Sequence, residues 1–319
     1  MTKAFHGRLA VSVLTLAVCA GRVMAQDQGG QGPGRESDDQ SSKISVHPTN
    51  PIETAPTAGG TGSLAPITAH GGPVMGTPTV YLIWYGNWNQ SNASDTAAGQ
   101  TLVRDFLFGI SNSPYFQINT TYKGPTGFVS VGGETTDTGS LGTRLSDANI
   151  RTIVVNAISS GKLPLNANGV YFVLTSSNVS ERSGFCTQYC GWHTYTTVQG
   201  IAVKYSFVGN ANRCLNACAA QTVGPNGNAG VDGMLSVVAH ELEEATTDPQ
   251  LNAWFDSSGA ENADKCAWTF GQSTTLGGNG AYYNMSLPGQ SVGSRNYLIQ
   301  RNLSASDSKC YVNWVTKAQ

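Results

Sequence analysis

The fold is decided by an apolar run of seven residues, Gly169-Val170-Tyr171-Phe172-Val173-Leu174-Thr175. Its β-branched and aromatic side chains are typical of a buried strand. Two runs of similar composition, Thr79–Trp84 and Ile201–Val208, predict further strands. Apolar residues at helical spacing occur in Asp95–Ile110 and in Ser146–Ile158, between the strands. This alternation predicts an α+β fold, a single domain in which helices pack on a mixed sheet.

A third helix is predicted after these strands, over Val231–Pro249, with Asp232 as its N-cap. Apolar residues recur along one face of this helix, and His240 and Glu244 lie one turn apart on the opposite face. The segment therefore combines a core-forming face with a face that carries chemistry.

This helix contains His-Glu-x-x-Glu at positions 240–244, one residue away from the His-Glu-x-x-His signature of zinc peptidases. In that signature two ligands one turn apart bind the metal, and the intervening Glu is the general base. The pattern predicts a zinc-peptidase-like active-site helix in which His240 and Glu244 are zinc ligands and Glu241 is the catalytic base. A carboxylate in place of the second His remains a competent zinc ligand and also admits harder metals.

A catalytic zinc usually has three protein ligands, so one more is expected. Glu261 and Asp264 are the favoured candidates because Cys266 can fix their loop through a disulfide. Asp248, two turns beyond His240, is the less favoured alternative. The competing interpretation is that these acidic residues form a solvated helix face. His193 is interpreted as a structural hydrogen-bonding residue rather than a ligand.

The N-terminus has the three parts of a secretion signal, and residues 1–25 are predicted to be a cleaved signal peptide. Residues 26–66 are rich in Gly, Gln, Ser, Pro and Thr and have almost no large apolar side chain, which predicts a flexible leader. Residues 67–319 are then the globular domain. The protein is expected to be secreted and to act outside the cell.

Six cysteines would remain after signal cleavage, an even number that favours disulfides in an oxidising compartment. The simplest connectivity joins the two Cys-x3-Cys pairs locally and closes the remaining two, although six cysteines allow 15 pairings. A zinc cluster is the rival interpretation. The six are Cys186, Cys190, Cys214, Cys218, Cys266 and Cys310.

Charge and hydropathy exclude several partners. Charged residues make up 12% of the chain and the formal net charge is −2, so no basic surface for nucleic acid is expected. No segment beyond the signal is apolar for long enough to form a membrane anchor. The expected partner is an extracellular substrate or ligand, a peptide or a cell-wall component.

Several motifs in one order resemble the EXORDIUM family, also called the phosphate-induced protein 1 family, known from plant cell walls and from microbes. They are His70–Pro73, Val80–Gly86, Gly169–Ser176, Gly184–Cys186, Cys190 with Gly191 and His193, Cys214 with Cys218, and Gly230–Met234. The resemblance runs from about His70 to Cys310. It implies an extracellular protein, linked in plants to growth and to brassinosteroid or phosphate responses. Plant members lack the His-Glu pair on the helix after Val231-Asp232-Gly233-Met234.

Two functions follow. The first is a secreted, metal-dependent hydrolase of the peptidase type that uses His240, Glu241, Glu244 and either Glu261 or Asp264. The second is a non-catalytic cell-wall binding or signalling protein in which any metal is structural. Burial of the ligands in an open cleft would favour the first, and a closed, packed site would favour the second.

Overall fold

The structure is a computed structural model that describes Met1, residues 43–45, 64–271 and 273–314. Met1–Gly32 form a separate unit, of which only Met1 is described, and Pro33–Gln319 form the unit described below. The predicted signal peptide and most of the predicted leader therefore lie outside the described residues. Among the described helices, none is long and apolar enough to cross a membrane.

A six-stranded mixed sheet in the order β1-β8-β9-β6-β3-β4 forms the centre of this unit. The four strands β9, β6, β3 and β4 are mutually parallel, whereas β8 runs antiparallel to β9 and β1 antiparallel to β8. The strands are β1 (Lys43–Ser45), β3 (Thr79–Tyr85), β4 (Ser130–Asp137), β6 (Gly169–Thr175), β8 (Tyr189–Val198) and β9 (Ile201–Gly209). The predicted α+β fold with a mixed sheet is confirmed.

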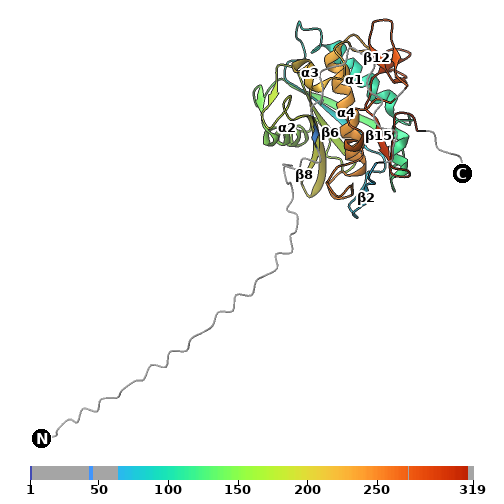
Figure 1. Cartoon of the computed structure of the whole chain (residues 1–319). Coiled ribbons are helices and arrows are strands. Elements are labelled where there is room, and N and C mark those ends of the chain that lie inside the picture. Colours follow the sequence, from blue (N-terminus) through green and yellow to red (C-terminus); the bar gives the residue numbers. More distant parts are fainter. Residues whose placement is uncertain (2–42, 46–63, 272, 315–319) are drawn as a thin grey trace. The chain divides into compact units, whose positions relative to one another are not determined.

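Helices cover both faces of the sheet, so that all seven residues of β6 are buried. They are α1 (Ala97–Ile110), α2 (Asp147–Ser159), the single turn α3 (Leu215–Cys218) and α4 (Ala229–Thr247). On β8, Thr196 accepts a hydrogen bond from Arg151 of α2, and Gly191 faces Val237 of α4. Positions 191 and 196 point to opposite faces of a strand, so α2 and α4 lie on opposite sides of the sheet, as Figure 1 shows.

The helix starts follow from local capping chemistry. Ser146 and Asn149 form a capping box at the start of α2. Asn228 caps α4 by accepting a hydrogen bond from Val231 N at 3.1 Å. The prediction that Asp232 is the N-cap of α4 is wrong, because the helix begins one turn earlier. The Asp232 carboxylate instead accepts hydrogen bonds from Asn226.

The chain after α4 packs on the side of this helix that faces away from the sheet. Gln300 N donates to Ser236 Oγ at 3.1 Å, and Asn302 Nδ2 donates to Glu243 Oε2 at 2.7 Å. Short elements complete the unit: β2 (Thr68–Ala69), β5 (Arg144–Leu145), β7 (Ser180–Glu181), β10 (Trp254–Phe255), β11 (Thr275–Leu276), β12 (Tyr282–Tyr283), β13 (Met285–Leu287), β14 (Arg295–Tyr297), β15 (Asn302–Ser304), β16 (Lys309–Tyr311), and the 3-10 turns η2 (Phe116–Thr121), η3 (Ala211–Arg213) and η4 (Asp264–Cys266). The sheet and the C-terminal segment thus enclose α4.

Three disulfides join the six cysteines, and two of them differ from the simplest prediction. The bonds are Cys186–Cys214, Cys190–Cys218 and Cys266–Cys310, with Cα–Cα distances of 5.8, 5.4 and 5.8 Å. Local pairing within each Cys-x3-Cys is wrong. Cys214 and Cys218 lie one turn apart at the two ends of α3, so their side chains point to the same side of this turn. There Cys214 meets Cys186, just before β8, and Cys218 meets Cys190 in β8. The predicted Cys266–Cys310 pair is present.

The predicted flexible leader contains one described strand. Lys43–Ser45 form β1 and pair with Tyr189–Trp192 at the edge of β8. The expectation of a leader without regular structure is therefore wrong for these three residues. The rest of residues 26–63 lie outside the described part of the chain.

Candidate metal centre

Helix α4 is buried over almost its whole length, including its charged residues. The side chains of His240, Glu241, Glu243 and Glu244 are each 0% exposed. The alternative of a solvated helix face is therefore wrong. Gly191 of β8 allows this close packing, because a Cβ there would lie 2.5 Å from Val237 Cγ1 and 3.1 Å from Glu241 Oε1.

The first group of possible ligands consists of His240, Glu244 and Asp264. His240 Nε2 lies 2.9 Å from Glu244 Oε1 and 3.5 Å from Asp264 Oδ1. Asp264 N also donates to Glu244 Oε1 at 3.1 Å, which holds η4 against the helix. The structure thus brings one of the two favoured downstream carboxylates to the helix pair.

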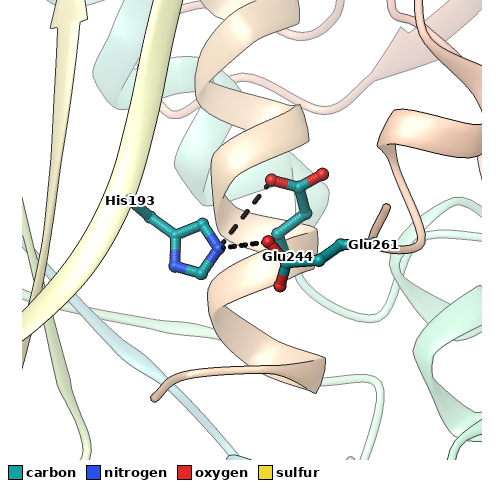
Figure 2. A group of neighbouring side chains, drawn as sticks. All are labelled: His193, Glu244 and Glu261. Carbon is teal, nitrogen blue, oxygen red and sulfur yellow. Dashed lines mark hydrogen bonds and ion pairs between the residues drawn. The ribbon is translucent and has the colours of Figure 1, made fainter. Parts of the chain in front are cut away.

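The second group consists of His193, Glu244 and Glu261, drawn in Figure 2. His193 projects from β8, and its Nε2 lies 3.1 Å from Glu261 Oε2 and 3.8 Å from Glu244 Oε2. The ring and the two carboxylates converge from a strand, a helix and a loop (Figure 2). Both downstream candidates therefore lie at the cluster, and Glu244 belongs to both groups.

The loop that carries Glu261 and Asp264 is held by several contacts. Asp256 accepts hydrogen bonds from Ser258 N and Ala260 N and pairs with Lys265. Glu261 N donates to Asp264 Oδ2 at 3.1 Å, and the adjacent Cys266 forms a disulfide to Cys310. These contacts fix the positions of both carboxylates before any ligand binds.

Several buried polar atoms of the cluster have no hydrogen-bond partner among the residues that the structure describes. They include Glu244 Oε2 and Glu261 Oε1, on side chains that are 0% and 1% exposed. His240 Nε2 also makes no hydrogen bond of acceptable geometry, although Glu244 Oε1 is close. Unsatisfied buried polar atoms are uncommon in native proteins and call for a specific explanation, such as an ion.

Burial shifts the acid–base behaviour of the cluster. It raises the pKa of Glu244 to about 7, with the nearby Asp264 charge adding to the effect. Burial and the Glu244 charge hold the pKa of Glu261 well above its usual range. Burial and the neighbouring His240 lower the pKa of His193 to about 3. Burial would also lower the pKa of His240, but the Glu244 charge and Asp264 outweigh it and raise that pKa.

The donor set fits a zinc ion. Ligand atoms 2.0–2.2 Å from a tetrahedral zinc lie roughly 3.4 Å from one another. The four separations between a histidine nitrogen and a carboxylate oxygen, 2.9 and 3.5 Å in the first group and 3.1 and 3.8 Å in the second, lie around this value. Imidazole with carboxylate is a donor combination that suits zinc and other first-row divalent metals.

The other acidic residues of α4 occupy different positions. Glu241 lies on the sheet side of the helix near Gly191, and its charge is felt by His240. Glu243 accepts from Asn302, on the side of the C-terminal segment. Asp248 Oδ1 accepts from the backbone N–H groups of Asn252 and Ala253 at 2.6 and 2.7 Å, and Asp248 belongs to neither group.

His193 belongs to the second group of possible ligands, although the sequence favoured a structural hydrogen-bonding role for it, and it does hydrogen-bond Glu261. Its segment, Tyr189–Val198, was not predicted as a strand, so the direction of the ring toward α4 was not anticipated. A usable signal was the alternation along β8: Gly191 and His193 share one face, and the close approach required of glycine marks the face that meets the helix.

A model of the "Phosphate-induced protein 1 conserved region" family matches residues 67–313. Protein EXORDIUM-like 3 of Arabidopsis thaliana is 32% identical over 285 residues, which cover 76% of this chain and 81% of the relative. Protein EXORDIUM-like 5 of the same plant is 30% identical over 287 residues, 76% of each chain. Protein PHOSPHATE-INDUCED 1 of Nicotiana tabacum is 25% identical over 288 residues, 75% of this chain and 85% of its own. No solved structure gives a significant match.

Proposed function

The chain belongs to the phosphate-induced protein 1 family, and from this premise we propose that it is an exported metalloprotein that holds a divalent cation, zinc, in its buried His-carboxylate cluster. The observation that carries the proposal is the meeting of His240, Glu244 and Asp264 at ligand-like separations inside the protein. His240 and Glu244 lie on α4, and Asp264 is held against it by the hydrogen bond from its backbone N–H to Glu244 Oε1.

A bound cation would remove the energetic cost of burying the carboxylates of this cluster. A buried carboxylate needs a counter-charge or hydrogen bonds, and otherwise it takes up a proton. Glu244 and Glu261 each have an oxygen without a hydrogen-bond partner, and their ion pairs within the described residues are with histidines. A divalent ion satisfies these atoms and favours ionised carboxylates with neutral imidazoles.

Export is supported by the three disulfides, which persist in oxidising compartments. The N-terminal sequence pattern of a signal peptide supports it independently. The closed site favours a structural role for the ion within an extracellular binding or signalling protein. Three members of the cluster, His193, His240 and Glu244, have fully buried side chains.

Peptidase-type hydrolysis is the second candidate function, and the position of Glu241 favours it. This carboxylate precedes the ligand Glu244 by three residues, as the general base does in the zinc-peptidase signature. A bound zinc would lower the pKa of a coordinated water to about 7. Asp264, with a side chain 16% exposed, is the member of its group through which water could reach the cluster. Glu241 would accept the proton, and the loop around Asp264 would have to open for a substrate.

The decisive experiment is elemental analysis of the purified, oxidised protein beside two matched variants. His240→Ala should remove stoichiometric metal, because it deletes a ligand. His70→Ala should keep the metal, because His70 stacks on Phe255 outside the cluster. Wild-type protein that contains no metal after incubation with zinc would end the proposal.

The catalytic candidate needs a separate test. Glu241→Gln should retain the ion and lose any cleavage of denatured protein substrates that the wild type shows. Equal cleavage by both proteins, or no cleavage by the metal-loaded wild type, would leave only the non-catalytic function.

A further inference from the structure

Glu244 faces two histidines with two different oxygens. Its Oε1 lies 2.9 Å from His240 Nε2, and its Oε2 lies 3.8 Å from His193 Nε2 (Figure 2 shows the second group). Each histidine also has its own carboxylate, Asp264 for His240 and Glu261 for His193. The cluster thus consists of two sets of donors that share one bidentate side chain.

We propose that Glu244 bridges two divalent cations, one bound by His240, Asp264 and Glu244 Oε1, the other by His193, Glu261 and Glu244 Oε2. The inference rests on the proposed metal-binding function and extends it from one ion to two. It assigns His193 and Glu261 to a second binding site.

The second group combines one hydrogen-bonded contact, between His193 Nε2 and Glu261 Oε2 at 3.1 Å, with one separation that a direct contact does not explain. The 3.8 Å between His193 Nε2 and Glu244 Oε2 is too long for a hydrogen bond, yet it is close to the roughly 3.4 Å expected between two zinc ligands. Glu261 Oε1 and Glu244 Oε2 have no hydrogen-bond partner and are buried. A carboxylate that bridges through both oxygens keeps two ions about 3.5–4 Å apart, as in known two-metal sites.

The balance of charge also favours two ions. Glu244, Glu261 and Asp264 carry three negative charges when ionised, and Glu241 adds a fourth carboxylate beside His240. The ion pairs of the first three within the described residues involve only His193 and His240, and the nearby Lys265 pairs with Asp256. One divalent ion would leave at least one of these carboxylates without a cation, so that it would have to take up a proton or remain charged in a largely buried site.

The rival arrangement has one ion, with His193 and Glu261 as a hydrogen-bonded pair that only positions Glu244. The two arrangements differ in metal stoichiometry. Zinc-loaded wild type and the His70→Ala control should contain two ions per chain. His193→Ala and Glu261→Gln should each contain one, and His240→Ala should keep no more than one. Glu244→Gln, which removes the bridge, should lower the content of both sites.

The outcomes separate this inference from the proposed function. One ion in wild type that persists in His193→Ala would overturn the bridge and leave the metalloprotein proposal intact. No ion in wild type would overturn both. Loss of all metal in His193→Ala would mean a single ion shared by both groups and would also overturn the bridge.

A measurement on the wild type avoids dependence on the folding of variants. X-ray absorption of the zinc-loaded protein should contain metal–metal scattering at about 3.5–4 Å. Metal-loaded protein without that scattering, at two ions per chain, would place the second ion elsewhere and refute the bridge.

Discussion

Two buried carboxylate regions in this molecule differ in how their oxygens are satisfied. Asp95 is 0% exposed and accepts hydrogen bonds from five donor groups, which belong to Gln90, Asn92, Ser177 and Asn210. Glu244 and Glu261 are equally buried, yet each has an oxygen without a hydrogen-bond partner. The difference teaches that burial alone does not mark a functional site. Both oxygens of the Asp95 carboxylate are hydrogen-bonded within the protein, whereas the cluster on α4 keeps carboxylate oxygens that no described residue hydrogen-bonds.

The largest expected effect on stability comes from the Cys266–Cys310 disulfide, which lies next to the cluster around Glu244. Replacing both Cys266 and Cys310 by Ala should lower the free energy of unfolding by about 4 kcal/mol, because the bond closes a long loop. The same replacement of Cys186 and Cys214 should cost nearly as much. Only the first variant should also bind zinc more weakly, because Cys266 ends the turn that carries Asp264. Equal zinc affinity in both variants would show that the disulfide does not preorganise the site.

Asp95→Ala tests the buried carboxylate whose oxygens are all hydrogen-bonded. The variant should lose about 2 kcal/mol of unfolding free energy, because the buried Asn210 amide and the half-buried donors of Ser177 and Gln90 lose a charged acceptor. The loss should be the same with and without zinc, as measured by denaturant titration. Asp307→Ala, at an exposed carboxylate, is the control and should change stability by less than about 0.5 kcal/mol. A loss at Asp95 that depended on zinc would contradict the contrast between the two regions.

The parts of the fold that the sequence predicted are those with strong local patterns. The apolar runs of β3, β6 and β9 and the helical spacing of α1, α2 and α4 gave these elements within a few residues. The polar strand β4 and the Cys-, Gly- and Thr-containing β8 were missed, because their strand conformation depends on pairing with neighbours. The local pattern alone did not specify that pairing.

The residues of the candidate site also divide into those that the local sequence could group and those that it could not. His240 and Glu244 could be grouped because residues four apart on a helix are neighbours. Glu261 and Asp264 could be named only as candidates, since their approach to α4 depends on the loop and on the Cys266–Cys310 bond. His193, close to Cys190, was interpreted as a structural hydrogen-bonding residue rather than a ligand, and its strand was not recognised. The disulfide partners of the Cys-x3-Cys pairs were wrong for a related reason, the unforeseen packing of α3 on β8.

The cluster around Glu244 should also make the stability of the protein depend on pH when zinc is removed with a chelator. Burial raises the pKa of Glu244 from 4.5 to about 7, so the folded state holds this proton more tightly than the unfolded chain does. Stability therefore falls as pH rises toward that value. The raised pKa of His240 acts in the same direction. Above pH 6.5 the unfolded chain loses this proton while the folded state keeps it, so stability falls as pH rises.

His193 opposes these effects only at lower pH. Its pKa falls from 6.5 to about 3 on folding, so it destabilises the protein below pH 6.5 and not above it. Between about pH 6.5 and pH 8 the metal-free protein should lose at least about 1 kcal/mol, measured by urea denaturation, because the raised pKa values of Glu261 and His240 add to the effect of Glu244. Glu244→Gln should lose less, and zinc-loaded wild type should show no such loss, because the ion replaces the protons. Metal-free protein that gained stability over this interval would contradict the assignment.

The smallest effect is expected where polar groups lose a protein partner but remain near water. A chain that begins at Ser63 lacks β1, so the edge of β8 from Tyr189 to Trp192 loses its paired strand. Backbone N–H and C=O groups at a sheet edge can bond to water instead, and a hydrogen bond exchanged for one to water changes stability little. Differential scanning calorimetry should therefore give thermal midpoints for the truncated and full mature chains that correspond to a difference below about 1 kcal/mol. A much larger loss would mean that β1 covers groups that water cannot reach, and the edge of β8 would then resemble the buried carboxylates rather than an ordinary sheet edge. The expected result instead makes access to water the property that separates a harmless unpaired group from the costly ones around Glu244.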